Sequence, residues 1–197
     1  MAKFMVLALP RSRTAWMAEW LAFDGRFDVG HDLAVECSSV QDFEDSLDAV
    51  DGSVETGAVL GWRLLRAWHP EMRLATVHRP VGDVLGSLAK LGLGPAYAPD
   101  MVARAEMLRA AAGAPGVMSV GFEGLSYEPV AAPLWEHLLQ IDWDYEWWKD
   151  CCERNIQIDM AARLRRLAAN APGLDRLKLE IVYEVSQLTD GAECRLN

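Results

Sequence analysis

The chain has 197 residues, of which 51% are hydrophobic and 24% are charged, and its formal net charge is −10. These values are typical of a globular domain and exclude general disorder. The negative charge argues against broad binding of nucleic acid or of an anionic membrane, because both need a large positive field.

The first two thirds of the chain alternate between strand and helix patterns. The apolar run 4–9 predicts a strand buried on both faces, and the next helix has Ser12 as a possible N-cap and an apolar stripe of Trp16, Met17, Trp20 and Leu21. Further strands are expected at 27–29, 53–58, 73–78 and 117–122. Helices are expected near 39–50, 62–68, 80–91 and 101–108, and then at 133–139, 145–154, 159–169 and 174–188.

This alternation predicts an α/β fold with a parallel sheet and right-handed crossovers. We expect one domain, with an α/β nucleotide-binding core at 1–127 and a helical C-terminal extension at 128–197 packed on it. The late tryptophans are expected to pack in the core, with an acceptor pocket lined by aromatic rings as the alternative.

The four cysteines form no CxxC pair, and adjacent Cys151 and Cys152 suit neither a zinc site nor an ordinary disulfide framework. We therefore expect no metal and a reducing, cytoplasmic setting. The run 4–9 is too short for a signal-peptide core, and no segment reaches the ~20 apolar residues of a membrane span.

A first candidate anion site lies at 10–14, in the turn between the first strand and its helix. Ligands of open parallel sheets bind at the carboxyl ends of strands, where helix N-termini present free N–H groups. Arg11 can add a charge-assisted bond, and the hydroxyls of Ser12 and Thr14 can donate two more. The alternative is a surface turn with solvated arginines. Because the Gly-Lys-[Ser/Thr] ending of triphosphate-binding loops is missing, an ATPase or GTPase is disfavoured.

A second candidate anion site pairs Arg79, at the end of the 73–78 strand, with Ser87, two helical turns later. Two such sites on one sheet are what a nucleotide phosphorylated at both ends requires. The alternative for Arg79 is a capping role or an ion pair with Asp83.

Together, residues 9–16 and 78–87 resemble the two nucleotide motifs of the cytosolic-type sulfotransferase superfamily, which uses 3′-phosphoadenosine-5′-phosphosulfate (PAPS). The first is similar to Pro-[Lys/Arg]-Ser-Gly-Thr-[Thr/Ser]-Trp, and its compact form is similar to small bacterial or phage members. The resemblance implies that Arg11 contacts the bridging and sulfuryl oxygens, within a loop that includes Arg13 and Ala15. It also implies that Ser12 and Thr14 contact the 5′-phosphate, and that the 3′-phosphate is held by Arg79 and Ser87.

The resemblance further implies a three-layer P-loop-like fold and transfer of a sulfuryl group to a hydroxyl or amine of a small-molecule or glycan acceptor. The product is adenosine 3′,5′-bisphosphate (PAP), and no metal is required. Arg13 stands where the family has glycine, which tolerates positive φ where arginine generally does not. The late Arg-Lys-Gly and Gly-x-x-Gly-x-Trp-Lys segment of the eukaryotic enzymes is not visible.

A general base is implied beyond the second or third strand. The favoured pair is His31 and Asp32, with Glu55 next and Glu36 as a further candidate. Alternatively, Asp32 caps a turn, His31 is a satisfied imidazole and Glu55 belongs to an acidic run. The other histidines, His69, His78 and His137, are interpreted as structural.

Two other functions remain open. One is a nucleotide or small-molecule kinase of the P-loop class, which predicts magnesium-dependent ATP binding. The other is a non-catalytic nucleotide-binding or assembly protein of the same fold.

Overall fold

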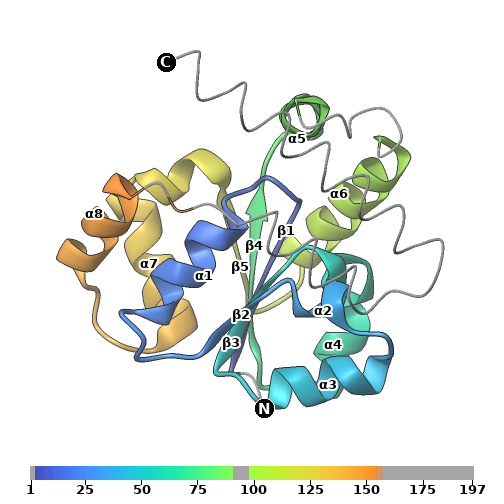
Figure 1. The fold of residues 1–197 in the computed structure, drawn as a ribbon, viewed down its shortest axis with the longest axis horizontal. Helices are drawn as coiled ribbons and strands as arrows, with labels where there is room; N and C mark the ends of the chain where they lie inside the picture. The colour runs from blue at the N-terminus through green and yellow to red at the C-terminus, as the bar shows by residue number, and fades with distance from the viewer. Residues whose placement is uncertain (1–2, 91–97, 155, 157–197) are drawn as a thin grey trace, which may run out of the picture. The chain divides into compact units, whose positions relative to one another are not determined.

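The computed structural model describes residues 3–90, 98–154 and 156, all within a unit that spans Met1–Ile156. Its centre is a five-stranded sheet in the order β2-β3-β1-β4-β5, with every neighbouring pair parallel. The strands are β1 (Phe4–Ala8), β2 (Val29–His31), β3 (Gly52–Glu55), β4 (Arg73–His78) and β5 (Val117–Gly121). Helices cover both faces (Figure 1), so the predicted three-layer α/β fold is confirmed.

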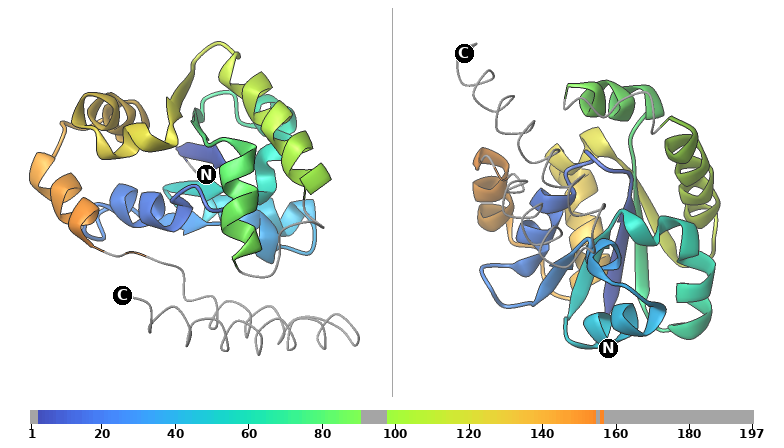
Figure 2. Two further views of the ribbon diagram at one scale, coloured as in Figure 1. Left: turned by 90° about the horizontal axis from the view of Figure 1, so that it is seen from above. Right: turned by 45° about the vertical axis from the view of Figure 1, so that its right-hand side comes forward.

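One face of the sheet carries α1 (Thr14–Ala22), α7 (Glu128–Leu139) and α8 (Tyr145–Glu153). The other carries α3 (Val40–Asp48), α4 (Trp62–Trp68) and α6 (Ala98–Ala112), and Figure 2 shows both layers from two further directions. In β1, alternate residues enter the two cores, with Phe4, Val6 and Ala8 in one and Met5, Leu7 and Leu9 in the other. This explains why the strand is continuously apolar.

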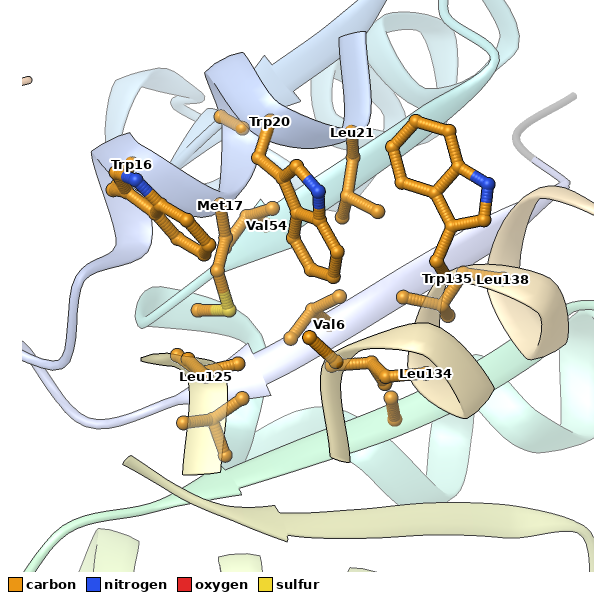
Figure 3. Packing of buried hydrophobic residues seen from close by; sticks show 14 of the residues in the cluster. Val6, Trp16, Met17, Trp20, Leu21, Val54, Leu125, Leu134, Trp135 and Leu138 are labelled. Carbon is orange, nitrogen blue, oxygen red and sulfur yellow. The ribbon is translucent and has the colours of Figure 1, made fainter. Parts of the chain in front are cut away.

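Tryptophan rings fill the core between α1, α7 and the sheet. The ring centroid of Trp20 lies 5.2 Å from that of Trp16 and 5.6 Å from that of Trp135, and Figure 3 shows these rings beside the aliphatic side chains. The indole Nε1 of Trp147 donates to the carbonyl of Trp20 at 2.8 Å, which ties α8 to α1. The late tryptophans that this cluster includes therefore pack the core, and they anchor the helix that follows β1.

Several element boundaries differ from the predicted ones. β2 begins two residues later than the expected 27–29, and Phe27, which precedes it, packs against the same core as Val29. α7 begins at Glu128 and has Pro133 in its interior, whereas a start at 133 was expected. The short helix α2 (Leu33–Glu36) and the 3-10 helices η1 (Gly57–Gly61) and η3 (Phe122–Ser126) were not predicted. The helices expected at 159–169 and 174–188 lie outside the described residues.

Among the helices that the structure describes, none is both long enough and apolar enough to cross a bilayer. In the same part of the chain, Cys37, Cys151 and Cys152 carry free thiols.

Candidate functional site

The turns after β1 and β4 open at the same edge of the sheet. The two strands are paired neighbours, and Ala8 lies opposite Val77 near their carboxyl ends. Helix α5 (Val81–Ala89) follows β4 and lies beyond this edge, at the top of Figure 1. The topology therefore places the first motif beside the second.

Side-chain contacts join the two motifs directly. Arg11 Nε donates to Ser87 Oγ at 3.0 Å, and Arg79 Nη1 donates to the backbone carbonyl of Arg11. The first contact joins residues 76 positions apart in the chain. The structure therefore brings Arg11, Arg79 and Ser87 to one place, as a shared ligand site requires.

Arg13 occupies its loop position in the left-handed conformation, with φ 59° and ψ 29°. Such a backbone costs a non-glycine residue roughly 1–2 kcal/mol. Arg13 Nη1 donates to Ser126 Oγ, and its guanidinium lies 5.2 Å from the ring centroid of Phe122. Arg79 stacks on the same ring at 4.4 Å. These contacts with η3 help to offset the cost of the strained backbone. Arg13 can therefore adopt the left-handed conformation that glycine would adopt more readily.

Ser12 does not cap α1, contrary to the expectation, because Arg13 occupies the N-cap position without a side-chain cap bond. The Ser12 side chain is fully buried, and its Oγ has no hydrogen-bond partner among the described residues. A buried polar group without a partner costs about 1–3 kcal/mol. Thr14 and Ala15 begin α1, where the first N–H groups have no partner within the helix. An anionic oxygen against this turn would accept from both kinds of donor, so these residues fit a phosphate.

Three guanidinium groups thus meet at this edge of an acidic protein. Within the described ranges, no ion pair joins Arg11, Arg13 or Arg79 to a carboxylate. Unneutralised guanidinium groups that lie close together repel one another and attract an anion. The electrostatics of the edge therefore favour an anionic ligand.

The candidate bases form a second cluster at the ends of β2 and β3. His31 Nε2 lies 3.8 Å from Asp32 Oδ2, and Asp32 Oδ1 accepts from the backbone N–H of Thr56 at 2.7 Å. His31 is partly exposed, whereas Asp32 is buried. Glu36 ends α2 and is exposed. The structure therefore brings His31 and Asp32 together, and His31 is the more accessible of the two.

Glu55 holds the start of α2. Its two carboxylate oxygens accept from the backbone N–H groups of Leu33 at 2.8 Å and Ala34 at 3.2 Å, and Ser53 Oγ donates to it as well. Burial is the main reason that the pKa of Glu55 rises to about 7, and the nearby Asp32 adds to the rise. Because the carboxylate is fully buried behind these donors, its direct role is to fix the chain after His31.

The raised pKa of Glu55 predicts a specific pH dependence of stability. Its value is 4.5 in a free chain and about 7 in the fold, so ionisation opposes folding. This contribution lowers the free energy of unfolding as pH rises from about 4.5 to about 7, by up to about 3 kcal/mol. When the free energy of unfolding is measured by urea denaturation at pH 5 and pH 8, we expect it to decrease less between the two pH values for Glu55→Gln than for the wild type.

The matched control is Glu106→Gln, which changes an exposed carboxylate on α6. Equal pH dependence of the wild type and Glu55→Gln would contradict the assignment.

Sequence reasoning missed the contribution of η3. The contact of Arg13 with Ser126 spans 113 positions, and nothing in the local pattern marks either Ser126 or Phe122. Among the residues that the structure describes, no three His, Cys, Asp or Glu side chains group as metal ligands.

No family model and no curated protein matches this chain. Among solved structures, its fold is similar to that of mouse sulfotransferase SULT7A1 complexed with PAP, with a TM-score of 0.57 and 13% sequence identity. The similarity covers 86% of this chain and 66% of the mouse protein, so the chain spans a little under two thirds of that relative's length. At this identity the comparison shows the fold alone: the parallel sheet and its flanking helices have the arrangement of a sulfotransferase.

Proposed function

We propose that the protein is a sulfotransferase that moves a sulfuryl group from PAPS to a hydroxyl or amine acceptor. The observation that carries the proposal is the meeting of Arg11, Arg79 and Ser87 in direct hydrogen-bond contact. The similar fold of a sulfotransferase complexed with PAP supports it. The form of the 10–14 loop supports a small bacterial or phage-type member.

The residues at the edge divide between the two ends of such a nucleotide. Arg79 and Ser87 would hold the 3′-phosphate, and the unpartnered Ser12 hydroxyl, Thr14 and the first N–H groups of α1 would hold the 5′-phosphate. When bound, PAPS supplies an activated sulfuryl group, whose transfer leaves negative charge on the oxygen kept by PAP. We assign to Arg11 the stabilisation of that charge, for which its Nε would exchange Ser87 for the leaving oxygen.

His31 is proposed to accept the proton that the acceptor hydroxyl or amine loses. A neutral imidazole suits this task near pH 7, and Asp32 at 3.8 Å stabilises the imidazolium that forms. Glu55 positions this pair through α2. No metal is required in this scheme. The proposed partners are the nucleotide and a small-molecule or glycan acceptor, without nucleic acid or membrane, and the proposed location is the cytoplasm.

Nucleotide-induced shifts in melting temperature test the proposal. PAP is expected to raise the melting temperature more than AMP, because only PAP carries the 3′-phosphate. Charge-assisted hydrogen bonds contribute about 1.5–3 kcal/mol, so PAP should bind roughly ten- to a hundredfold more tightly than AMP. Arg79→Ala should remove this preference while leaving the response to AMP.

Asp83→Ala, on the exposed face of α5, is the matched control and should keep the preference. Equal responses of the wild type to PAP and AMP would contradict the proposal. Magnesium-dependent binding of ATP in place of PAP would favour the kinase alternative. Tight PAP binding without transfer to any acceptor of a broad panel would favour the non-catalytic one.

A further inference from the structure

The chain after β2 and the chain at the end of β3 hold each other through hydrogen bonds in both directions. Glu55 accepts from the first N–H groups of α2. In return, the backbone N–H of Asp32 donates to the carbonyl of Val54 at 2.9 Å, and the Oδ1 atom of Asp32 accepts from the N–H of Thr56 at 2.7 Å. Asp32 is buried and has a left-handed backbone, with φ 54° and ψ 40°. The position of Thr56 therefore helps to set the position of this carboxylate.

Thr56 is itself held by Arg104, which lies on α6. Arg104 Nη1 donates to the carbonyl of Thr56 at 2.6 Å, a contact between residues 48 positions apart in the chain. The Nε atom of the same guanidinium donates to Asp100 Oδ2 at 2.8 Å, one helical turn earlier. The Arg104 side chain is only 20% exposed and Thr56 is buried. Two bonds to a planar guanidinium fix its orientation, so Arg104 fixes the backbone at Thr56.

Close packing couples this part of the backbone to α2 as well. A Cβ atom added to Gly57 would lie 3.0 Å from Val35 Cγ2 and 3.2 Å from Ala34 Cβ. Neighbours this close cannot move independently of one another. A shift of residues 56–57 would therefore be felt by Asp32 and by the helix that follows it.

We infer that Arg104 is a positioning residue for the proposed base, His31. Arg104 holds Thr56, and Thr56 in turn fixes Asp32. The inference rests on the proposed function, which makes His31 the proton acceptor. Because Asp32 Oδ2 lies 3.8 Å from His31 Nε2, the place of the carboxylate decides how strongly it stabilises the imidazolium.

The alternative is that Arg104 only ties α6 to η1 and acts on His31 through its own charge. The two roles predict opposite signs for the Arg104→Met variant. Loss of a cation makes the imidazolium of His31 easier to form, whereas displacement of a carboxylate makes it harder to form.

An NMR titration of the His31 imidazole, assigned with His31→Asn, measures this sign without nucleotide or acceptor. We expect its midpoint to lie roughly 0.5 pH units lower in Arg104→Met than in the wild type, the size expected when a partly exposed ion pair is weakened. Asp32→Asn should also lower the midpoint. In the Asp32→Asn background, Arg104→Met should lower it no further, because the carboxylate through which Arg104 acts is gone.

Asp100→Asn is the matched control, because it removes the charge beside Arg104 Nε and keeps an oxygen that accepts from it. Its midpoint should equal that of the wild type. An unchanged or raised midpoint in Arg104→Met would overturn the inference, as would an equal fall in the Asp32→Asn background. If the amide spectrum shows that Arg104→Met is unfolded, Arg104→Lys decides in its place. A lysine keeps the charge but cannot reproduce both bonds of the guanidinium, so a midpoint equal to that of the wild type would overturn the inference.

Sulfuryl transfer supplies the second readout, with PAPS as the donor and the same acceptor for every variant. The kcat of Arg104→Met is expected to fall about tenfold to a hundredfold, since small misplacements of a catalytic group have costs of this size. The KM for PAPS should stay at the wild-type value, because we assign the nucleotide to other residues. An unchanged kcat would show that Arg104 does not act on the base. An unshifted His31 midpoint with normal PAP binding overturns only this inference, whereas failure of the wild type to bind PAP overturns the proposed function.

Discussion

Turnover of the Arg11→Ala variant is expected to fall by about a hundredfold to a thousandfold, as happens when one donor is removed from an oxyanion site. The reason is that Arg11 is the cation of the loop nearest the transferred group in the proposed arrangement. Among the described residues, its side chain makes one hydrogen bond, to Ser87, and packs in neither core, so its removal should change the free energy of unfolding little. The measurement is the rate of transfer of labelled sulfate from PAPS to an acceptor that the wild type uses.

Arg11→Lys is the matched variant, because it keeps the charge and loses the second donor direction. It should retain more activity than Arg11→Ala, with equal melting temperature. A transfer rate for Arg11→Ala within a fewfold of the wild-type rate would contradict the proposed role of Arg11 in sulfuryl transfer.

Trp135→Ala is expected to lower the free energy of unfolding by about 3–5 kcal/mol, the usual cost of removing a buried tryptophan. The ring is fully buried, lies 5.0 Å from the Phe23 centroid in an edge arrangement, and its Nε1 donates to the carbonyl of Asp142 at 3.0 Å. The loss leaves a cavity between α7 and α1, the helix that follows the loop proposed to hold the 5′-phosphate. Urea denaturation measures the effect, and PAP affinity should fall with it as α1 loosens.

The control for Trp135→Ala is Trp68→Ala, which removes an indole that is 47% exposed. Surface substitutions of this kind usually stay within about 0.5 kcal/mol. Similar losses for the two variants would mean that the tryptophan cluster does not anchor α1.

Much of the architecture could be predicted because the order of hydrophobic and polar residues within short segments indicates the strands and helices. The apolar run of β1 and the 73–78 strand were predicted within one residue, since strands buried on both faces have an unmistakable composition. The convergence of Arg11 with Arg79 followed from one topological rule, that parallel strands end at the same edge. The positive φ at Arg13 was not predicted, because arginine generally avoids the conformation that the motif's glycine tolerates.

The parts that could not be predicted depend on contacts between distant segments. Helix α2 has only four residues, and it begins where Glu55 on another strand accepts from its N–H groups. No periodicity in so short a segment can indicate a helix. Likewise, the guanidinium groups of Arg13 and Arg79 both lie over the ring of Phe122, which is remote from each of them in sequence.

A crystal structure of the protein soaked with PAP is the most direct test of the claim that the two arginine motifs hold one nucleotide. The account predicts density for both phosphates, one against Ser12, Thr14 and the start of α1, and the other between Arg79 and Ser87. Density for PAP elsewhere, or for one phosphate at this edge with the other in solvent, would contradict it.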